Sequence, residues 1–159
     1  MKHRIYIKNE QIEEAYTPAM RSYIVSAVVK TLNYEEFEDP CEVSVTLTND
    51  EGIRVLNKEY RDKDSATDVL SFPLIDGEYT EEDMIDGYLP LGDIVISLQR
   101  ARAQAESLGH GINEETAFLC VHSTLHLLGY DHETSPEDEE EMFSHQKAIM
   151  KLVRGEKDE

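Results

Sequence analysis

The chain has 159 residues, with 34 acidic and 15 basic side chains and a formal charge of -19 at pH 7. Its hydrophobic fraction of 40% excludes a disordered acidic chain, and no apolar run approaches the ~20 residues that a membrane-spanning helix needs. A nucleic-acid binder usually carries a basic surface, so the charge at first argues against that class of function. The length predicts a single domain over residues 1–153, with a frayed tail at residues 154–159.

Two periodicities predict the secondary structure: alternation for strands and a 3.6-residue repeat for helices. The predicted order is a strand at 3–8, a helix at 17–32, a strand at 41–48, a helix at 49–60, a strand at 68–72, a strand at 91–96, a helix at 97–108, a helix at 113–128 and a last helix at 136–153. The expected N-caps include Asn49 or Asp50, Ser97 and Asn113. This order predicts an α+β domain, one small sheet with helices packed against it.

The excess negative charge is concentrated in two clusters, residues 76–86 and residues 137–141. We expect both to be solvated surface, the first in an exposed loop at residues 74–90; a docking face for a basic partner is the alternative. Four bases fall within ten residues and predict a small positive patch: Arg54, Lys58, Arg61 and Lys63.

The cysteines and the first residues indicate the compartment. Cys41 and Cys120 are distant in the sequence, and residues 1–10 alternate between apolar and polar types without the apolar core of a signal peptide. A disulfide scaffold is therefore not expected. We expect a cytoplasmic protein that is not associated with a membrane.

Three of the six histidines fall in one short segment, HSTLHLLGYDH. His122 and His126 share a face of the predicted helix, and a sharp turn at Gly129 can return the ring of His132 to the other two. Three neutral imidazoles suit zinc, which prefers nitrogen ligands at ~2.0–2.1 Å, and they leave a fourth position for water or substrate. The segment therefore predicts one catalytic zinc ion per chain, bound by His122, His126 and His132.

The other histidines and Cys120 have simpler expected roles. His3 and His110 are predicted to lie on the surface, and His145 is predicted to pack within the last helix. Cys120 precedes the first histidine of the segment by two residues, about 200° around the helix, so its thiol is expected to be buried away from the metal.

The histidine spacing also matches that of metzincin proteases, HExxHxxGxxH, in which the Glu is the general base. This chain has Ser123 at the position of that Glu. Without a carboxylate there, the usual route to activating water for peptide hydrolysis is missing. A zinc peptidase is therefore the alternative rather than the main interpretation.

HSTLHLLGYDH resembles the signature of the YbeY family of bacterial metal-dependent endoribonucleases. The segments LNKEYRDKDSATDVLSFP (Leu56 to Pro73) and LGDIVIS (Leu91 to Ser97) agree with the same family, as does the length. The resemblance covers about residues 40–135. Ser123 departs from the family pattern at a position where many members have glycine, which is also small.

The resemblance implies a small mixed, mostly parallel four-stranded sheet packed with about five or six helices. It also implies cleavage of single-stranded RNA, in maturation of the 16S rRNA 3′ end, in ribosome assembly and in quality control. His122, His126 and His132 take the places of the family's zinc ligands. Arg61 takes the place of its functionally important arginine.

The planar guanidinium of Arg61 suits a phosphate and the charge that develops on it, although a salt bridge with Asp62 or Asp64 is the alternative. The attacking group, water or the 2′-OH of the substrate, stays open. The roles of three acidic residues near the predicted cleft also stay open: Asp68, Asp93 and Asp131.

Three functions are weighed: a zinc endoribonuclease, a metzincin-like zinc peptidase, and a non-catalytic module that binds ribosome-assembly factors. The charge of -19 is compatible with the first if RNA contacts a short cleft of local cations, since phosphate affinity comes from such cations. Basic ribosomal proteins or assembly factors are then the expected partners that deliver the enzyme to the 16S rRNA precursor.

Overall fold

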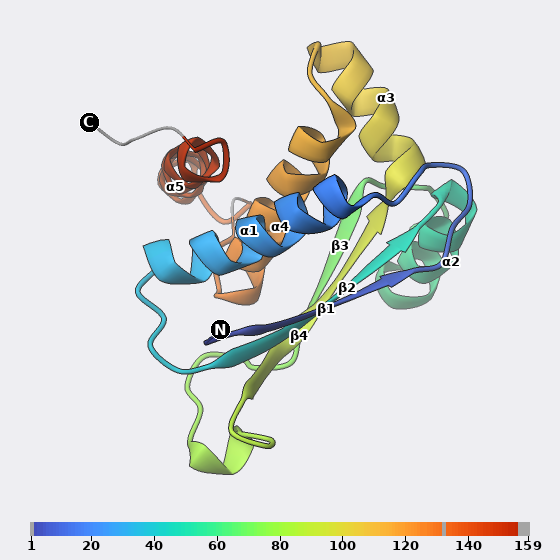
Figure 1. Ribbon diagram of the computed structural model, residues 1–159. Helices are drawn as coiled ribbons and strands as arrows, with labels where there is room; N and C mark the ends of the chain where they lie inside the picture. Colours follow the sequence, from blue (N-terminus) through green and yellow to red (C-terminus); the bar gives the residue numbers. More distant parts are fainter. Residues whose placement is uncertain (1, 132, 156–159) are drawn as a thin grey trace.

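A four-stranded sheet forms the centre of the computed structural model, which describes residues 2–131 and 133–155 (Figure 1). The strands are β1 (Arg4–Asn9), β2 (Cys41–Thr48), β3 (Val69–Pro73) and β4 (Leu89–Ser97), and their order is β1-β2-β4-β3. β1–β2 and β2–β4 are parallel, whereas β3 is antiparallel to β4. The predicted mixed, mostly parallel sheet is confirmed, and β3 forms one of its two edges.

Five α-helices and one short 3-10 helix surround the sheet within the described ranges. They are α1 (Pro18–Tyr34), α2 (Asp50–Arg61), the 3-10 helix η1 (Glu81–Asp83), α3 (Leu98–Leu108), α4 (Ile112–Leu127) and α5 (Pro136–Val153). Figure 1 shows α1 and α4 crossing the same face of the sheet. No helix among the described residues is long and apolar enough to cross a membrane.

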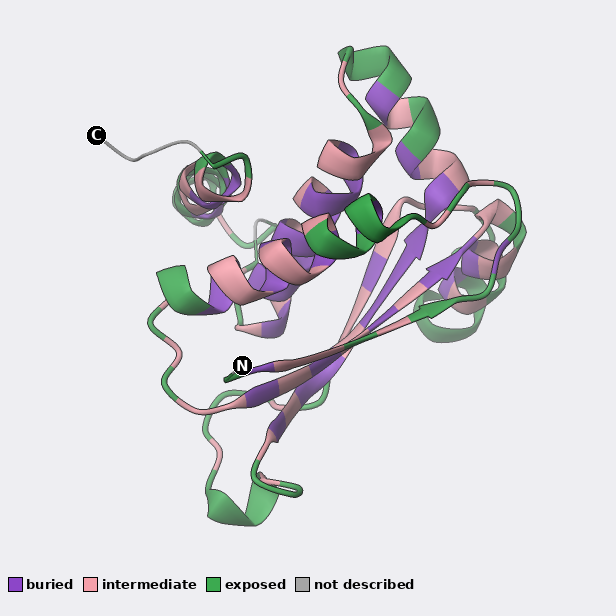
Figure 2. Ribbon diagram, in the orientation of Figure 1, coloured by how far each residue is buried: buried purple, intermediate pink, exposed green. Residues whose placement is uncertain are grey.

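The alternation along the strands separates two apolar clusters. Ile94 and Ile96 belong to the main core beneath α1 and α4, whereas Val95 and its partner Leu70 on β3 pack against Ile53 of α2. Successive side chains of a strand point to opposite faces, so α2 covers the other face of the sheet. Figure 2 shows the buried residues along the strands and on the sides of α1 and α4 that face them.

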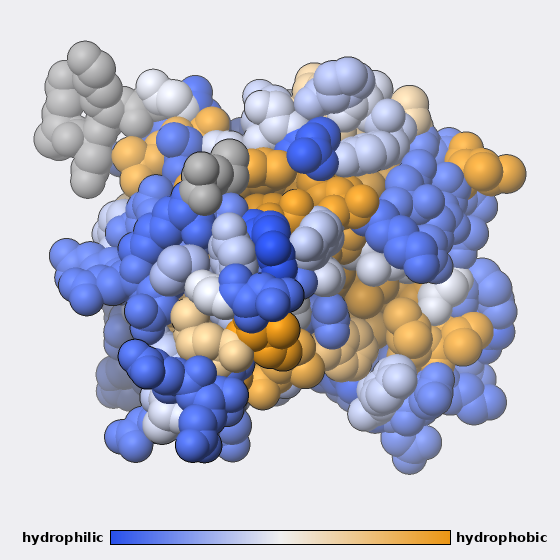
Figure 3. Space-filling model, turned by 60° about the horizontal axis from the view of Figure 1, so that its bottom comes forward, coloured by the Kyte–Doolittle hydropathy of each residue, from blue (hydrophilic) through white to orange (hydrophobic). Residues whose placement is uncertain are grey.

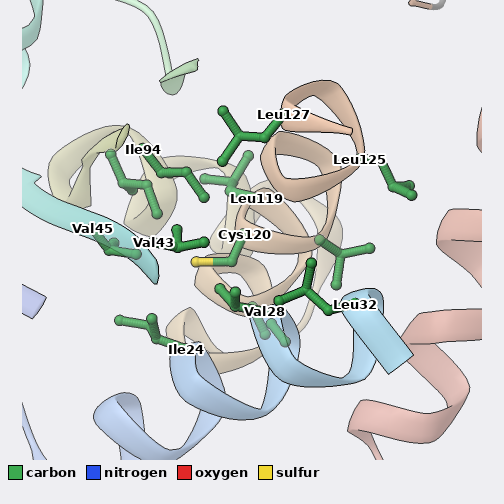
Figure 4. Packing of buried hydrophobic residues seen from close by; sticks show 14 of the residues in the cluster. Ile24, Val28, Leu32, Val43, Val45, Ile94, Leu119, Cys120, Leu125 and Leu127 are labelled. Carbon is green, nitrogen blue, oxygen red and sulfur yellow. The ribbon is translucent and has the colours of Figure 1, made fainter. Parts of the chain in front are cut away.

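Cys120 belongs to the main core, as expected. Its sulfur lies among Val28 of α1 and Val43 of β2 (Figure 4), and burial raises the pKa of its thiol to about 12. Cys41 is buried as well, and both cysteines are free thiols. Neither thiol is therefore available as a thiolate ligand near neutral pH.

Side-chain caps fix most of the helix starts. The Asn49 side chain accepts a hydrogen bond from the Gly52 N–H at 2.8 Å, and Ser97 Oγ accepts one from the Arg100 N–H at 3.3 Å. The prediction that Asn113 caps α4 is wrong, because that helix starts at Ile112 after Gly111. In the first turn of this helix, the buried Glu115 lies 2.7 Å from His110.

Gly92 allows β4, β3 and α4 to approach closely. A Cβ at this position would lie 2.6 Å from both the Phe72 carbonyl oxygen and the Leu127 side chain. A β-bulge between Glu42 and Val43 lies beside it in the register of β2 and β4. The lack of a side chain therefore brings the C-terminal half of α4 against the edge strand β3.

The surface is largely hydrophilic. All the acids of residues 76–86 and 137–141 are exposed, as expected of solvated clusters. In the view of Figure 3, hydrophilic residues dominate the face and hydrophobic residues gather in a band across its middle. The prediction that His3 lies on the surface is wrong: it is 3% exposed, its Nδ1 accepts the Cys41 N–H at 3.0 Å, and burial lowers its pKa.

Candidate metal centre

Two imidazoles meet at the C-terminal end of α4. The Nε2 atoms of His122 and His126 lie 3.1 Å apart, and the two rings are partly buried with their centroids separated by 4.6 Å. The four-residue spacing places them on one face, as the sequence predicts. The third expected ligand, His132, lies outside the described residues, and no group of three potential ligands occurs among the residues described.

The spacing of the two nitrogens suits a tetrahedral metal. Ligands at ~2.0–2.1 Å on adjacent corners of a tetrahedron lie about 3.3–3.4 Å apart. The observed 3.1 Å is close to that separation, so a small shift of either ring would admit an ion between them. The two imidazoles are therefore spaced so that they could serve as two ligands of a zinc ion.

A third side chain contacts this pair from α5. The Gln146 amide nitrogen lies 2.9 Å from Nδ1 of His122, and its amide oxygen is buried with no hydrogen-bond partner among the described residues. A histidine that binds a metal through Nε2 carries its proton on Nδ1 and donates it to an acceptor. Rotating the Gln146 amide by half a turn about its last bond would place its oxygen, a hydrogen-bond acceptor, next to Nδ1 of His122. Gln146 therefore also fits a metal site.

Ser123, the residue after His122, makes a structural contact with a residue that lines the same cleft as the histidines. Ser123 is fully buried, and its hydroxyl lies 2.8 Å from the hydroxyl of Ser71 on β3. This hydrogen bond joins the edge strand to α4, the helix that carries the two histidines. The position that carries the general base in metzincins is thus occupied by a hydroxyl already engaged with β3.

A cleft of about 870 Å³ opens in front of the histidines. Its walls come from the end of α2, the edge strand β3 and the end of α4 with the turn that follows. The lining residues are Tyr60, Arg61, Thr67, Asp68, Val69, Leu70, Ser71, Phe72, His122, His126, Gly129, Tyr130, Asp131 and Glu133. The volume is at the upper end of the ~300–1,000 Å³ typical of ligand sites, large enough for more than one nucleotide.

Arg61 is the cation of this wall. It ends α2, is exposed, and forms no ion pair with any described residue. Of the two salt-bridge partners considered for it, Asp64 instead pairs with Arg54, which also binds Glu51. The guanidinium of Arg61 therefore remains available to the cleft, whereas Arg54 adds little to the expected positive patch.

The three acidic candidates differ in position. Asp68 lines the cleft, but its carboxylate accepts the Val69 N–H at 2.7 Å and the Gln104 amide at 3.2 Å. Asp131 also lines it and accepts the Glu133 N–H at 2.9 Å, a turn-capping contact. Asp93 on β4 is not among the lining residues. Asp68 and Asp131 thus support the backbone of the cleft.

A hydrogen-bonded trio holds the turn after α4. The Tyr130 hydroxyl donates to Glu35 at 2.5 Å, and Nδ1 of His145 lies 2.6 Å from the same carboxylate. Burial and this hydrogen bond raise the pKa of Tyr130. Gly129, with φ +105°, makes the preceding turn. His145 therefore packs within the fold as predicted, whereas no sequence signal identified Tyr130 or Gln146.

Comparison with known proteins matches this chain to one family. The family model described as Endoribonuclease YbeY matches residues 6–154. The Endoribonuclease YbeY of Bacillus cereus (strain G9842) is 43% identical over 145 residues, which is 90% of each chain. That of Acetivibrio thermocellus is 41% identical over 160 residues, covering 96% of this chain and 98% of the relative.

A solved structure supports the fold. The solution structure of TM1509 from Thermotoga maritima superimposes with a TM-score of 0.62 at 28% identity, and the match covers 96% of this chain and 89% of that one. Together, the sequence and structural matches favour the endoribonuclease over the peptidase and the non-catalytic module.

Proposed function

Because the chain belongs to the YbeY family and is thus an endoribonuclease, we propose that it is zinc-dependent and cuts single-stranded RNA. We propose the 3′ end of the 16S rRNA precursor as its substrate, in ribosome assembly and quality control. This finer assignment rests on the family resemblance of the residues 122–132 segment. The buried free thiols suit the reducing cytoplasm, where we propose that it acts.

One observation carries the proposal: two imidazoles 3.1 Å apart share a cleft with an arginine that has no ion pair to a described residue. His122 and His126 would hold the zinc ion, and the spacing of the histidines in the sequence predicts His132 as the third ligand. When bound, zinc supplies a Lewis acid that polarises a phosphate oxygen and lowers the pKa of a coordinated water.

The remaining roles belong to the protein's own side chains. Arg61 binds the scissile phosphate and stabilises the negative charge that develops on it, since its planar donors match two phosphate oxygens. After rotation of its amide, the Gln146 oxygen would accept the proton on Nδ1 of His122 and leave Nε2 unprotonated for the metal. Ser123 and Ser71 keep β3 and α4 together, so the two walls of the cleft hold their separation.

The charge distribution limits how RNA is held. The cleft lining contains one cation, Arg61, and three carboxylates, Asp68, Asp131 and Glu133. Bulk attraction between this protein and RNA is therefore weak. We propose that basic ribosomal proteins or assembly factors bind the exposed acids and bring the enzyme to its site on the precursor.

The substrate assignment is tested with the zinc-loaded protein on four substrates: a single-stranded RNA, the same sequence as a duplex, a 16S precursor 3′ fragment, and casein. We expect cleavage of the single strand and of the precursor, abolished by a chelator, and intact duplex and casein. Equal cleavage of duplex and single strand would overturn the strand preference, and chelator-sensitive cleavage of casein would favour the peptidase.

A further inference from the structure

Tyr60 presents an aromatic ring at the mouth of the metal cleft. The residue is 62% exposed, and its ring packs edge-to-face on Phe72 with centroids 5.2 Å apart and an interplanar angle of 67°. Both rings line the cleft that contains His122 and His126. What distinguishes Tyr60 from other exposed apolar side chains is that its ring shares a cleft with the two histidines, where its flat face can meet a ligand.

The Tyr60 ring is supported by Phe72, on the side away from solvent. Phe72 packs against the second apolar cluster, which contains Ile53 and Leu70. The turn after α2 is fixed by the buried Asn57, whose amide donates to the Ser65 carbonyl at 2.9 Å. Tyr60 therefore has a rigid support on one side and solvent on the other, which reduces the entropy lost when a flat ligand stacks on it.

Arg61, the residue after Tyr60, lines the same cleft, and two lysines lie close to it in the sequence. Lys58, Arg61 and Lys63 are exposed and form no ion pair with the residues that the structure describes. Arg54 on the same helix is, by contrast, bound to Glu51 and Asp64. An exposed aromatic ring that shares a cleft with an available arginine matches the chemistry of single-stranded nucleic acid, in which bases stack and phosphates pair with cations.

We propose that Tyr60, supported by Phe72, is the stacking platform for one unpaired base of the RNA beside the scissile phosphate. This inference rests on the proposed function and deepens it. Arg61 is the next residue in the chain, so a base on Tyr60 delivers its neighbouring phosphate to the arginine. A duplex keeps its bases stacked inside and cannot use the platform, which gives the site its preference for single strands.

The test is a double-mutant cycle that removes the Tyr60 ring from the protein and single bases from the RNA. Cleavage of a single-stranded RNA is compared with that of the same RNA carrying one abasic nucleotide at each position near the cut, for wild type, Tyr60→Phe and Tyr60→Leu. At one position we expect the abasic change to raise KM about 5- to 100-fold in wild type and Tyr60→Phe, and to add nothing in Tyr60→Leu. Additive losses at every position would overturn the platform.

A binding readout keeps the proposal testable if Tyr60→Leu fails to fold. The fluorescent base 2-aminopurine is placed at each position of the RNA, and its quenching is measured with the zinc-free wild-type protein. Quenching at one position supports stacking, and its absence at all positions overturns it. Tyr6→Leu is the matched control, since Tyr6 is 48% exposed on β1 at the opposite edge of the sheet; it should leave every readout unchanged.

The same data separate the two proposals. If zinc-loaded wild type cleaves single-stranded RNA and no abasic position couples to Tyr60, the platform is wrong and the endoribonuclease assignment stands. If the wild-type protein cleaves no RNA, the proposed function fails, and the platform fails with it.

Discussion

Gln146 of α5 reaches across to His122 of α4, with 2.9 Å between its amide nitrogen and Nδ1. In this arrangement the amide donates to Nδ1, and His122 carries its proton on Nε2, 3.1 Å from His126. Metal binding requires the other tautomer, with the proton on Nδ1. The amide has both a donor and an acceptor, so one rotation about its last bond satisfies either state.

Replacing that amide with an alkyl group should weaken the metal site. Gln146→Leu removes the acceptor for Nδ1–H while retaining a side chain that packs in the same place. We expect its zinc affinity, measured by competition with a chelating dye, to fall about 10- to 100-fold. Gln146→Glu keeps an acceptor and should retain the affinity. Equal affinity of Gln146→Leu and wild type would show that Gln146 does not orient the ligand.

Arg61 should be needed for cleavage and not for metal binding. Its guanidinium has no ion pair with a described residue and lines the cleft, so Arg61→Ala removes a phosphate contact without breaking a structural one. We expect kcat to fall about 10²- to 10³-fold with zinc content unchanged. Arg54→Ala, on the same helix but paired with Glu51 and Asp64, is the control. Undiminished cleavage by Arg61→Ala would eliminate its assigned role.

Asp93 should affect stability in a pH-dependent manner. Burial raises the pKa of its carboxyl, so the native state binds its proton more readily than the unfolded state does. Stability therefore falls as the pH rises through the carboxyl range, and the loss persists at neutral pH. We expect Asp93→Asn to raise the Tm near pH 7, with a gain that shrinks as the pH falls toward about 4.

Thermal unfolding of both proteins across that range checks the sign. A gain of equal size at neutral and acidic pH would contradict the electrostatic cause. Because Asp93 is not among the residues lining the cleft, RNA cleavage should be the same in both proteins. Loss of cleavage in Asp93→Asn would instead give this residue a place in the chemistry.

RNA binding by the isolated protein should be weak and should show the salt dependence of about three phosphate contacts. Three cations at the end of α2 are available to phosphates: Lys58, Arg61 and Lys63. Single strands lose about 0.7 log units of affinity per log unit of salt for each neutralised phosphate, so three contacts predict a slope of about -2. Titration of a labelled single strand at several salt concentrations measures it. A much steeper slope, or tight binding at high salt, would indicate a larger cationic surface.

Local patterns predicted most of the fold. The last helix runs over the expected residues 136–153, and Ser97 caps α3 as predicted, because helix spacing and a side-chain cap are both local features. The predicted cap at Asn113 is wrong, because α4 already begins at Ile112 after Gly111, with no side-chain cap hydrogen bond from the described residues. A capping preference of only ~1 kcal/mol does not by itself fix where a helix begins.

In the candidate site, too, only the features within one helix could be predicted from the sequence. The His122 and His126 pair follows from a spacing within one helix. Gln146 lies 24 residues beyond His122 on another helix, and only the packing of α5 beside α4 brings them together. The burial of His3 likewise depends on a tertiary contact with Cys41. Periodicity reports which residues share a face, and it cannot report which residue of another element lies opposite.

The central claim is that the histidines of α4 bind the metal that RNA cleavage requires. Zinc content and cleavage of a single-stranded RNA, measured on the same samples of wild type and His126→Ala, test it most directly. We predict about one zinc ion per chain and cleavage for wild type, and loss of both for His126→Ala. Cleavage by His126→Ala at the wild-type rate, with or without zinc, would contradict the account.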